Sequence, residues 1–424
     1  FYPKAGHFQR GRGGGMQHYT YGNIEDAEPY AGEDGSRVIS FFIFNTDVHL
    51  HAYPLGRDAA GPDGPGARGV AGAADAAAAG GDMAAAGGGV ATPGAGTVAG
   101  GDMSSGSGMF AGGDASNPTE CAADLDAALL ACRDRCRYFE LRLSRTREDS
   151  DVSRAHAASP RPVEVAPETA ELVDVARAYC AASRGCFDIT MGTVTRLWDF
   201  HEGVVPSSLE LARALPHVGV DNIEVDRAGE VPTLAITDPA CVLDLGGVAK
   251  GYIADDLAGL LERHGVGRFV INLGGNVVVR GGRPGDGASR PPVRAGDPWK
   301  IGVVNPRDPA HYRAIVDIAD GSVVTSGLHE RRFSRGGRTY HHILSPQDGM
   351  PARTDVASAT IIASRSLDCD GYSTTALMLG MDEGLAFAEE LEGVEAVLIG
   401  EDDEVRWTLG IAERLSLVPT LPRW

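Results

Sequence analysis

The chain has 424 residues and a formal net charge of -20 at pH 7, because 58 acidic residues outnumber 38 basic ones. This balance argues against nonspecific nucleic-acid binding, which requires a basic surface that displaces phosphate counterions. The sequence contains no apolar run of about 18 residues, so it predicts no transmembrane helix.

Cysteine usage and the first residues bear on the compartment. The seven cysteines are an odd number, and no pair has zinc-type spacing supported by a second pair. Cys132 and Cys136 are one helical turn apart, and we expect them to be small core residues. The chain starts at Phe1 and shows no signal segment. We therefore expect a cytoplasmic chain without disulfides. The alternative is a membrane-associated protein on the extracytoplasmic face, if an N-terminal anchor precedes Phe1.

In the first part of the chain, segments whose composition predicts a folded structure alternate with segments whose composition does not. Residues 1–36 show no sustained period and predict an irregular lead-in. Residues 37–55 are apolar at first and then alternate, which predicts the first strand of a folded domain, bent near Asn45. Residues 56–118 are dominated by Gly, Ala and Asp and cannot bury enough surface to offset the entropy of ordering. They predict a disordered insertion, after which the same domain resumes at 119–424.

The remaining chain mixes helices and strands. Amphipathic spacing predicts helices over 121–143 and 167–183, and residues 186–200 read as a binding loop or a half-buried strand. Further helices are expected at 366–380 and 381–391. Strands are expected at 269–273, 277–280, 299–304, 314–318, 322–325, 357–364, 394–399 and 405–408. Hairpins combined with segregated helices indicate an α+β fold with mixed sheets rather than a βαβ repeat.

One stretch, 241–258, combines a strand, a glycine turn and a helix start. Asp244 precedes Gly246 and Gly247, and Lys250 opens the helical spacing. Glycines let backbone N–H groups approach an anion closely, and the helix dipole favours the anion there. The spacing matches neither a Walker loop nor a dinucleotide fingerprint. The stretch therefore predicts a phosphate-facing turn, with a strand-to-helix turn whose glycines serve packing as the alternative.

Two further positions carry candidate chemistry. Asp370 and Thr374 are four residues apart, hence on one face of a helix start. A carboxylate, a hydroxyl and a free carbonyl from a glycine turn are hard oxygen ligands that suit Mg²⁺. The alternatives are a helix N-cap for Asp370 and a solvated helix position for Thr374. His342 precedes a turn, and its imidazole could act as a general base or orient an acceptor.

These stretches also carry a family resemblance. In order and spacing, six motifs resemble those of the FAD:protein FMN transferases, the ApbE family: FDITMGTVTRLW, DLGGVAKGYIADDLA, VINLGGNVVVRG, VVTSG with a later ERRF, HHILSPQDGMP and DGYSTTALMLG. The resemblance covers roughly residues 38–54 and 120–400. It implies a single α+β domain of that family. It also implies Mg²⁺-dependent cleavage of FAD, with FMN passed as a phosphoester to a threonine of an acceptor flavoprotein and AMP released.

The resemblance assigns roles by position. It implies a Mg²⁺ site formed by the backbone carbonyl of Gly247, the carboxylate of Asp370 and the hydroxyl of Thr374. His342 is the family-matching histidine, and with Asp370 it makes up the implied catalytic pair. The FAD contacts that it implies are Phe44, Thr146, Cys186, Phe187, Asp188, Asp244, Lys250 and Leu344.

Three positions depart from the family pattern. Phe44 stands where a methionine is usual, and Thr146 where a tyrosine is common. Ser345 replaces the usual aspartate of the turn that follows His342. At the first two positions the resemblance implies a weaker flavin contact, and at the third it assigns the turn no detailed role.

Two other functions stay open. With water in place of the protein hydroxyl, the same site would be an FAD pyrophosphatase that yields FMN and AMP. The chain could also be a flavin-binding protein without turnover, although the pair of Asp370 and Thr374 argues against a pure binder. The expected partners are FAD and an acceptor flavoprotein, and the sequence predicts no oligomeric state.

Overall fold

The computed structural model describes residues 24–54, 118–286 and 292–419. Contacts join the described residues before and after the segment 56–118 into one compact unit. The insertion expected at 56–118 lies outside the described residues except for Pro118, and so does the lead-in up to residue 23. Both remain predictions.

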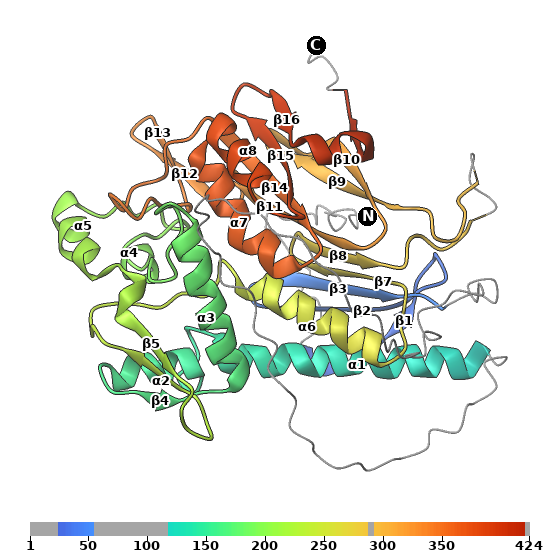
Figure 1. The fold of residues 1–424 in the computed structure, drawn as a ribbon, viewed down its shortest axis with the longest axis horizontal. Helices are drawn as coiled ribbons and strands as arrows, with labels where there is room; N and C mark the ends of the chain where they lie inside the picture. The colour runs from blue at the N-terminus through green and yellow to red at the C-terminus, as the bar shows by residue number, and fades with distance from the viewer. Residues whose placement is uncertain (1–23, 55–117, 287–291, 420–424) are drawn as a thin grey trace, which may run out of the picture. The chain divides into compact units, whose positions relative to one another are not determined.

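A nine-stranded sheet forms the centre of this unit (Figure 1), and every pair of neighbouring strands is antiparallel. Its strands, in spatial order, are β1 (Tyr30–Ala31), β2 (Arg37–Ile43), β3 (Thr46–Ala52), β7 (Phe269–Leu273), β8 (Asn276–Arg280), β11 (Gly321–Gly327), β14 (Val356–Ala363), β15 (Glu395–Gly400) and β16 (Val405–Trp407).

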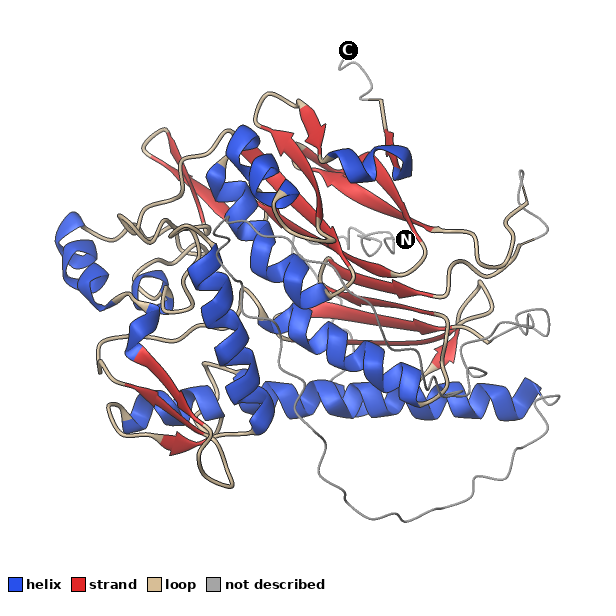
Figure 2. Cartoon of the chain, in the orientation of Figure 1, coloured by secondary structure: helices blue, strands red, loops and turns tan. Residues whose placement is uncertain are grey.

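Three smaller sheets accompany the central one (Figure 2). One is formed by β9 (Trp299–Asn305), β10 (Asp308–Ile318) and β17 (Leu415–Leu417). Another is formed by β4 (Val163–Glu164), β5 (Ile223–Asp226) and β6 (Thr233–Ile236). The last is a separate hairpin of β12 (Arg332–Arg335) and β13 (Arg338–His341).

Helices lie along one face of the central sheet (Figure 1). They are α1 (Pro118–Leu143), α6 (Ala249–Arg263), α7 (Ser366–Leu379) and α8 (Met381–Glu389). The helices α2 (Asp151–Ala158) and α3 (Pro167–Ala182) pack on the β4–β6–β5 sheet, and α4 (Gly192–Thr195) and α5 (Ser208–Ala214) pack in a separate apolar cluster with Trp198. Short 3-10 turns occupy Ile24–Asp26, Leu215–His217, Val220–Asn222 and Leu409–Arg414.

The hydrophobic pattern explains this layering. In α6 the residues Ile253, Leu257 and Leu261 recur at helical spacing and are buried against the central sheet. On the other face of the sheet, Val277 packs with Trp299 of the β9–β10–β17 sheet. Because both faces are covered, β7 and most of β8 are buried along their length, as continuous apolar runs predict.

The predicted α+β class is confirmed, with one correction near the start of the domain. The single strand expected over 37–55 is wrong, because the run folds into two strands, β2 and β3. The turn between them is Phe44-Asn45, with φ of 53° and 57°. These are the left-handed values of a tight hairpin turn, which usually contains glycine. The bend predicted near Asn45 marks the right place, but without glycine the pattern did not indicate a full reversal of the chain.

Two further expectations can be compared with the described residues. Cys132 and Cys136 are fully buried in the core beneath α1, as expected. Among the described residues, no helix combines the length and the apolar character needed to cross a bilayer.

Candidate active site

The N-terminus of α6 meets α7 at Asp370. The Gly251 backbone N–H donates to Oδ2 of Asp370 over 2.6 Å, and the Asp370 side chain is buried. In a regular helix this amide would donate to the carbonyl of Gly247, four residues earlier. No described residue donates to the Gly247 carbonyl, and Gly247 is exposed. Asp370 therefore takes a helix amide and leaves a backbone carbonyl available to a ligand.

The contact is reciprocal. Asp255 of α6 accepts hydrogen bonds from the backbone N–H groups of Ser366 and Leu367, over 2.7 and 2.9 Å. It thereby caps α7, whose own preceding residue provides no side-chain cap. A Cβ added at Gly251 would lie 2.5 Å from the Ser366 carbonyl oxygen, so only glycine allows this approach. Asp370 lies inside α7, which makes the N-cap alternative for that residue wrong.

Oxygen atoms gather on the side of α7 that faces this corner. Burial raises the pKa of Asp370 to about 6, and the nearby positive charge of Lys250 opposes the rise. Thr374 follows one helical turn later, and its Oγ1 lies 3.3 Å from Oγ of Ser326. Oγ of Ser326 in turn lies 2.8 Å from Oγ of Ser373. Of the predicted carboxylate–hydroxyl pair, Thr374 thus joins a small hydroxyl cluster, whereas Asp370 binds the Gly251 amide.

These donors suit a hard divalent cation. No group of three or more His, Cys, Asp or Glu side chains that could hold a metal occurs in the part of the chain that the structure describes. One carboxylate, one hydroxyl and one free carbonyl form a different kind of site, with positions left for water and substrate oxygens. Mg²⁺ is typically bound in this way. The residues present therefore fit Mg²⁺ that is held partly by a bound phosphate.

The glycine turn before α6 is fixed by Asp244. Oδ1 of Asp244 accepts from the Gly246 N–H over 2.9 Å, and its Oδ2 pairs with Nη1 of Arg145 over 3.1 Å. The ring of Phe187 lies against one side of Gly247, because a Cβ at that glycine would lie 2.9 Å from Cε2 of Phe187. Two predicted contact regions, 186–188 and 244–250, therefore meet at this turn.

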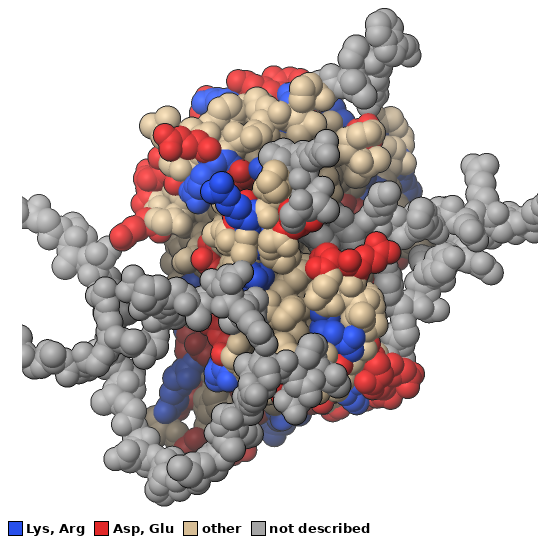
Figure 3. All heavy atoms as spheres, turned by 90° about the vertical axis from the view of Figure 1, so that its right-hand side faces the viewer, with Lys and Arg blue, Asp and Glu red and all other residues tan. Residues whose placement is uncertain are grey.

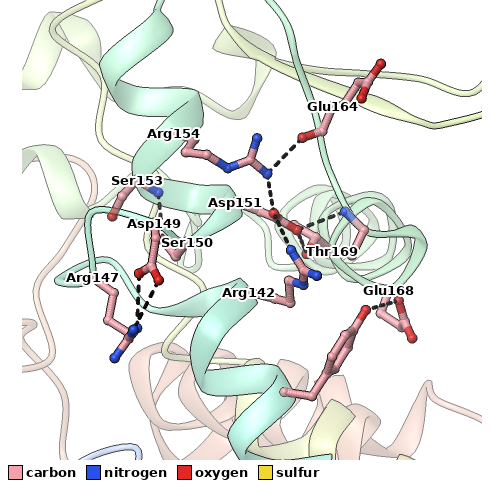
Figure 4. A network of polar contacts seen from close by, with 12 residues as sticks. Arg142, Arg147, Asp149, Ser150, Asp151, Ser153, Arg154, Glu164, Glu168 and Thr169 are labelled. Atoms are coloured by element: carbon pink, nitrogen blue, oxygen red, sulfur yellow. Dashed lines mark hydrogen bonds and ion pairs between the residues drawn. The ribbon is translucent and has the colours of Figure 1, made fainter.

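The loop that carries Arg145 and Thr146 is anchored by a buried carboxylate (Figure 4). Asp151 is fully buried and accepts from Oγ1 of Thr169 and the Ala166 N–H, each over 2.8 Å. It also pairs with Arg154 over 2.5 Å. In the same network, Ser150 caps α2 and its hydroxyl donates to the Ser144 carbonyl (Figure 4). The network holds the loop against the start of α2.

A cavity of about 830 Å³ opens beside this loop. Thr146 lines it, as do residues that the sequence analysis did not select, among them Arg145, His156, Arg196, Trp198, Phe200 and Arg331. The Trp198 and Phe200 rings stack with centroids 5.6 Å apart. An aromatic wall and several guanidinium groups can hold a flat anionic ligand.

His342 stands at the end of β13. Its backbone N–H donates to the Arg331 carbonyl over 3.1 Å, which ties it to the residue that lines the cavity. Burial lowers the pKa of His342 to about 3, and the positive charges of Arg331 and Lys250 act in the same direction. The imidazole is therefore neutral at pH 7. The charge of Lys250 acts on both His342 and Asp370, so its ammonium group lies within electrostatic range of each.

The other predicted contacts are distributed unevenly. Leu344 is buried in the same apolar cluster as Trp198, next to the cavity wall. Cys186 is half-buried, and Asp188 accepts from the Thr190 N–H and hydroxyl, which shapes the loop that carries Phe187. Phe44 packs on the core beneath α1 and does not line the cavity.

The structure explains the departure from the family pattern at Ser345 and why some site residues were not predicted. Ser345 Oγ accepts from the Gln347 N–H over 3.2 Å, so serine supplies the turn with a side-chain acceptor in place of the usual aspartate. Arg145 and Asp255 were missed because each acts on a residue about a hundred positions away. Arg331 lies in the quoted ERRF motif, but only the fold shows that it faces a cavity.

Comparisons with known proteins agree with this geometry. The model of the ApbE family matches residues 117–398. The FAD:protein FMN transferase of Treponema pallidum (strain Nichols) is 34% identical over 304 residues, which are 70% of this chain and 83% of the relative. A protein of the same name from Klebsiella pneumoniae (strain 342) is 30% identical over 286 residues, 67% of this chain and 84% of the relative.

Solved structures show the same fold. The ApbE protein of Thermotoga maritima superimposes with a TM-score of 0.65 at 22% identity, covering 89% of this chain and 99% of that one. The flavin transferase ApbE from Vibrio cholerae gives a TM-score of 0.62 at 20% identity, covering 92% and 99%. Because the family model spans most of the chain and the relatives align over most of their length, the chain belongs to the ApbE family.

Proposed function

We propose that the protein is an FAD:protein FMN transferase that cleaves FAD and attaches FMN to a threonine hydroxyl of an acceptor protein, releasing AMP. Relatives that align over more than four fifths of their own length carry this name. The observation that carries the proposal is the meeting of α6 and α7. There the Gly251 amide binds Asp370, and the Gly247 carbonyl is left without a donor.

In this proposal the chain's residues bind and orient the pyrophosphate. Gly247, Asp370 and Thr374 would hold Mg²⁺, which would offset the negative charge that develops on the phosphoryl oxygens. Lys250 lies close enough to act on Asp370 and His342, and it forms no ion pair with a described carboxylate. Its ammonium group is therefore free to bind a phosphate.

His342 would receive the proton of the acceptor hydroxyl. The hydroxyl oxygen forms a bond to the FMN phosphorus while the bond from that phosphorus to the bridging oxygen breaks. AMP leaves with the bridging oxygen, and the hydroxyl proton passes to the neutral imidazole. The low pKa of His342 keeps the imidazole unprotonated before the reaction.

Incubation with FAD tests this function. The protein is mixed with FAD and Mg²⁺, with and without a flavin-acceptor domain, and AMP and covalent flavin fluorescence in a denaturing gel are measured. We expect AMP and fluorescent acceptor together. AMP without any labelled acceptor would instead indicate a pyrophosphatase, and bound FAD without AMP would indicate a binding protein.

A further inference from the structure

The β12–β13 hairpin carries a concentration of positive charge. Four arginines, Arg331, Arg332, Arg335 and Arg338, fall within eight residues, and no Asp or Glu occurs from residue 331 to 347. All four are exposed. None of them forms an ion pair with a carboxylate among the described residues. In a chain of net charge -20, this segment differs from its surroundings.

Two of these arginines face each other directly. Arg335 and Arg338 are partners in the β-ladder, on either side of a Gly336-Gly337 turn with φ of 60° and 77°. Like charges at directly opposite positions destabilise a hairpin unless an anion lies between them. Arg338 lies over the Tyr340 ring at 5.3 Å, and Arg335 donates only to the Gly203 carbonyl over 3.4 Å.

The facing loop does not neutralise the pair. Asp199 accepts from the backbone N–H groups of His201 and Glu202, each over 2.9 Å. Glu202 itself lies 3.7 Å from His201. On another face of the molecule, drawn in Figure 3, acidic and basic side chains are interspersed in small groups. The hairpin is a local exception to that pattern.

The aromatic side chains of the hairpin are packed against the cavity wall, so the backbone that carries the arginines is held in place. The Phe333 and Tyr340 rings stack with centroids 5.3 Å apart, and Tyr340 and Phe333 contact Trp198 and Phe200 of the cavity wall. At one end the hairpin begins next to Arg331, which lines the cavity, and at the other it leads directly to His342. The hairpin arginines therefore belong to the segment that leads directly into His342.

We propose that the exposed arginines of the β12–β13 hairpin dock an acidic segment of the acceptor protein. This inference rests on the proposed function and adds the chemistry of the partner. Arg338 is four residues from His342, a span of roughly 13 Å in extended chain. An extended acceptor segment bound alongside would therefore carry its acidic residues about four positions from the target threonine.

Labelled peptides test the proposal directly. Three fluorescent 13-residue peptides carry one central threonine and, four residues to each side, Asp, Asn or Lys. Their binding to the full chain with FAD and Mg²⁺ is measured by anisotropy at 50 and 500 mM salt. We expect the Asp peptide to bind at least about ten times more tightly than the Asn peptide at low salt, with a smaller ratio at high salt.

Matched variants assign the effect to the hairpin. Arg335→Glu/Arg338→Glu should reverse the order so that the Lys peptide binds best, and Arg335→Gln/Arg338→Gln should remove the preference. The control, Arg294→Glu/Arg307→Glu, changes the net charge equally at two exposed arginines outside the hairpin and should keep the Asp preference. Melting temperature and FAD affinity are expected to stay unchanged in all variants.

Equal binding of the Asp and Asn peptides to the unchanged protein would overturn the proposal. So would a loss of the Asp preference in the control variant that equals the loss in the hairpin variants. An Asp preference that persists in folded hairpin variants would overturn it as well. Arginine-dependent binding of a single-stranded oligonucleotide or of anionic phosphatidylglycerol vesicles, without discrimination among the peptides, would assign the surface to those ligands instead. The proposed function is judged separately, since its failure appears as absence of AMP and covalent flavin, whereas peptide binding needs no turnover.

Discussion

The two sides of the candidate site treat charge in opposite ways. At the junction of α6 and α7, the buried carboxylates are bound by the chain itself: Asp255 by two amides of α7 and Asp370 by an amide of α6. On the β12–β13 hairpin, Arg335 and Arg338 face each other without any described carboxylate partner. A charge that is bound within the chain fixes a position, whereas one that is left unpaired is available to a ligand.

The difference separates two tasks. Catalysis gains from groups that are already oriented, because no reorganisation is then needed as charge develops. Recognition of a protein partner gains from exposed charge, which speeds encounter and selects partners. We therefore expect changes at the helix junction to reduce chemistry or stability, and changes at the hairpin to reduce discrimination between acceptors.

The largest effect is expected for Asp370→Ala. This change removes the carboxylate that the Gly251 amide orients, and with it the proposed Mg²⁺ ligand, so FAD cleavage should fall about 1000-fold or more. The melting temperature without metal should change little, because relief of the buried charge, whose cost the raised pKa reflects, offsets the lost hydrogen bond to the Gly251 amide. AMP release and calorimetry measure the two quantities. The exposed Asp382→Ala is the control, and full activity of Asp370→Ala would refute the metal assignment.

A smaller effect, roughly 100-fold on transfer, is expected for His342→Ala with FAD affinity preserved. Adjacent residues of an extended segment point to opposite faces, so His341→Ala should be mild. FAD affinity, melting temperature and transfer rate are measured on both variants. An equal loss of transfer in the two, or a His342 variant that fails because it unfolds, would show that the imidazole is not the proton acceptor.

The same contrast shows what sequence can and cannot supply. The placement of Asp370 and Thr374 on one helix face follows from helical spacing, and the turn at Gly246-Gly247 follows from local glycine chemistry. Both are properties of neighbouring residues. The Gly251 amide, in contrast, binds a carboxylate 119 residues away, and the sequence holds no local signal for that contact.

The hairpin was missed for a related reason. The sequence shows where its arginines are, but whether they are paired depends on which carboxylates the fold brings near. The β2–β3 turn was missed because Phe44-Asn45 adopts positive φ without glycine. The mixed α+β class was predictable because it depends on periodicity that is summed over many residues. The partner of one side chain, in contrast, depends on a single distance across the fold, which no sequence period reports.

A third change tests how tightly the helix junction is built. In Gly251→Ala the new Cβ would lie 2.5 to 2.8 Å from backbone atoms of Ser366 and Leu367, so α6 and α7 must separate. We expect a loss of about 1–3 kcal/mol in the free energy of unfolding and roughly tenfold in activity.

Gly259→Ala is the control in the same helix, since its Cβ would meet only the flexible end of Arg263. This variant should stabilise the protein by about 0.5–1 kcal/mol. Denaturant unfolding that ranks the two variants in the reverse order would contradict the close approach of the helices.

The smallest effect concerns how the folding stability of the protein falls with pH because of His156. Burial lowers the pKa of His156, whose Nε2 accepts from the Leu243 N–H over 3.1 Å just before Asp244. The unfolded chain binds a proton at this imidazole near pH 6.5, whereas the folded chain resists it. The stabilising contribution is therefore present above about pH 6.5 and is lost as the pH falls below it. Asp370, with its raised pKa, acts in the opposite direction between pH 3.8 and about 6, so the two effects on stability partly cancel.

We expect His156→Gln to reduce, by a few degrees, the drop in melting temperature between pH 7.5 and 5.5. The exposed His201→Gln should leave the drop unchanged, and a drop that is identical in all three proteins would show that His156 does not act as a neutral acceptor.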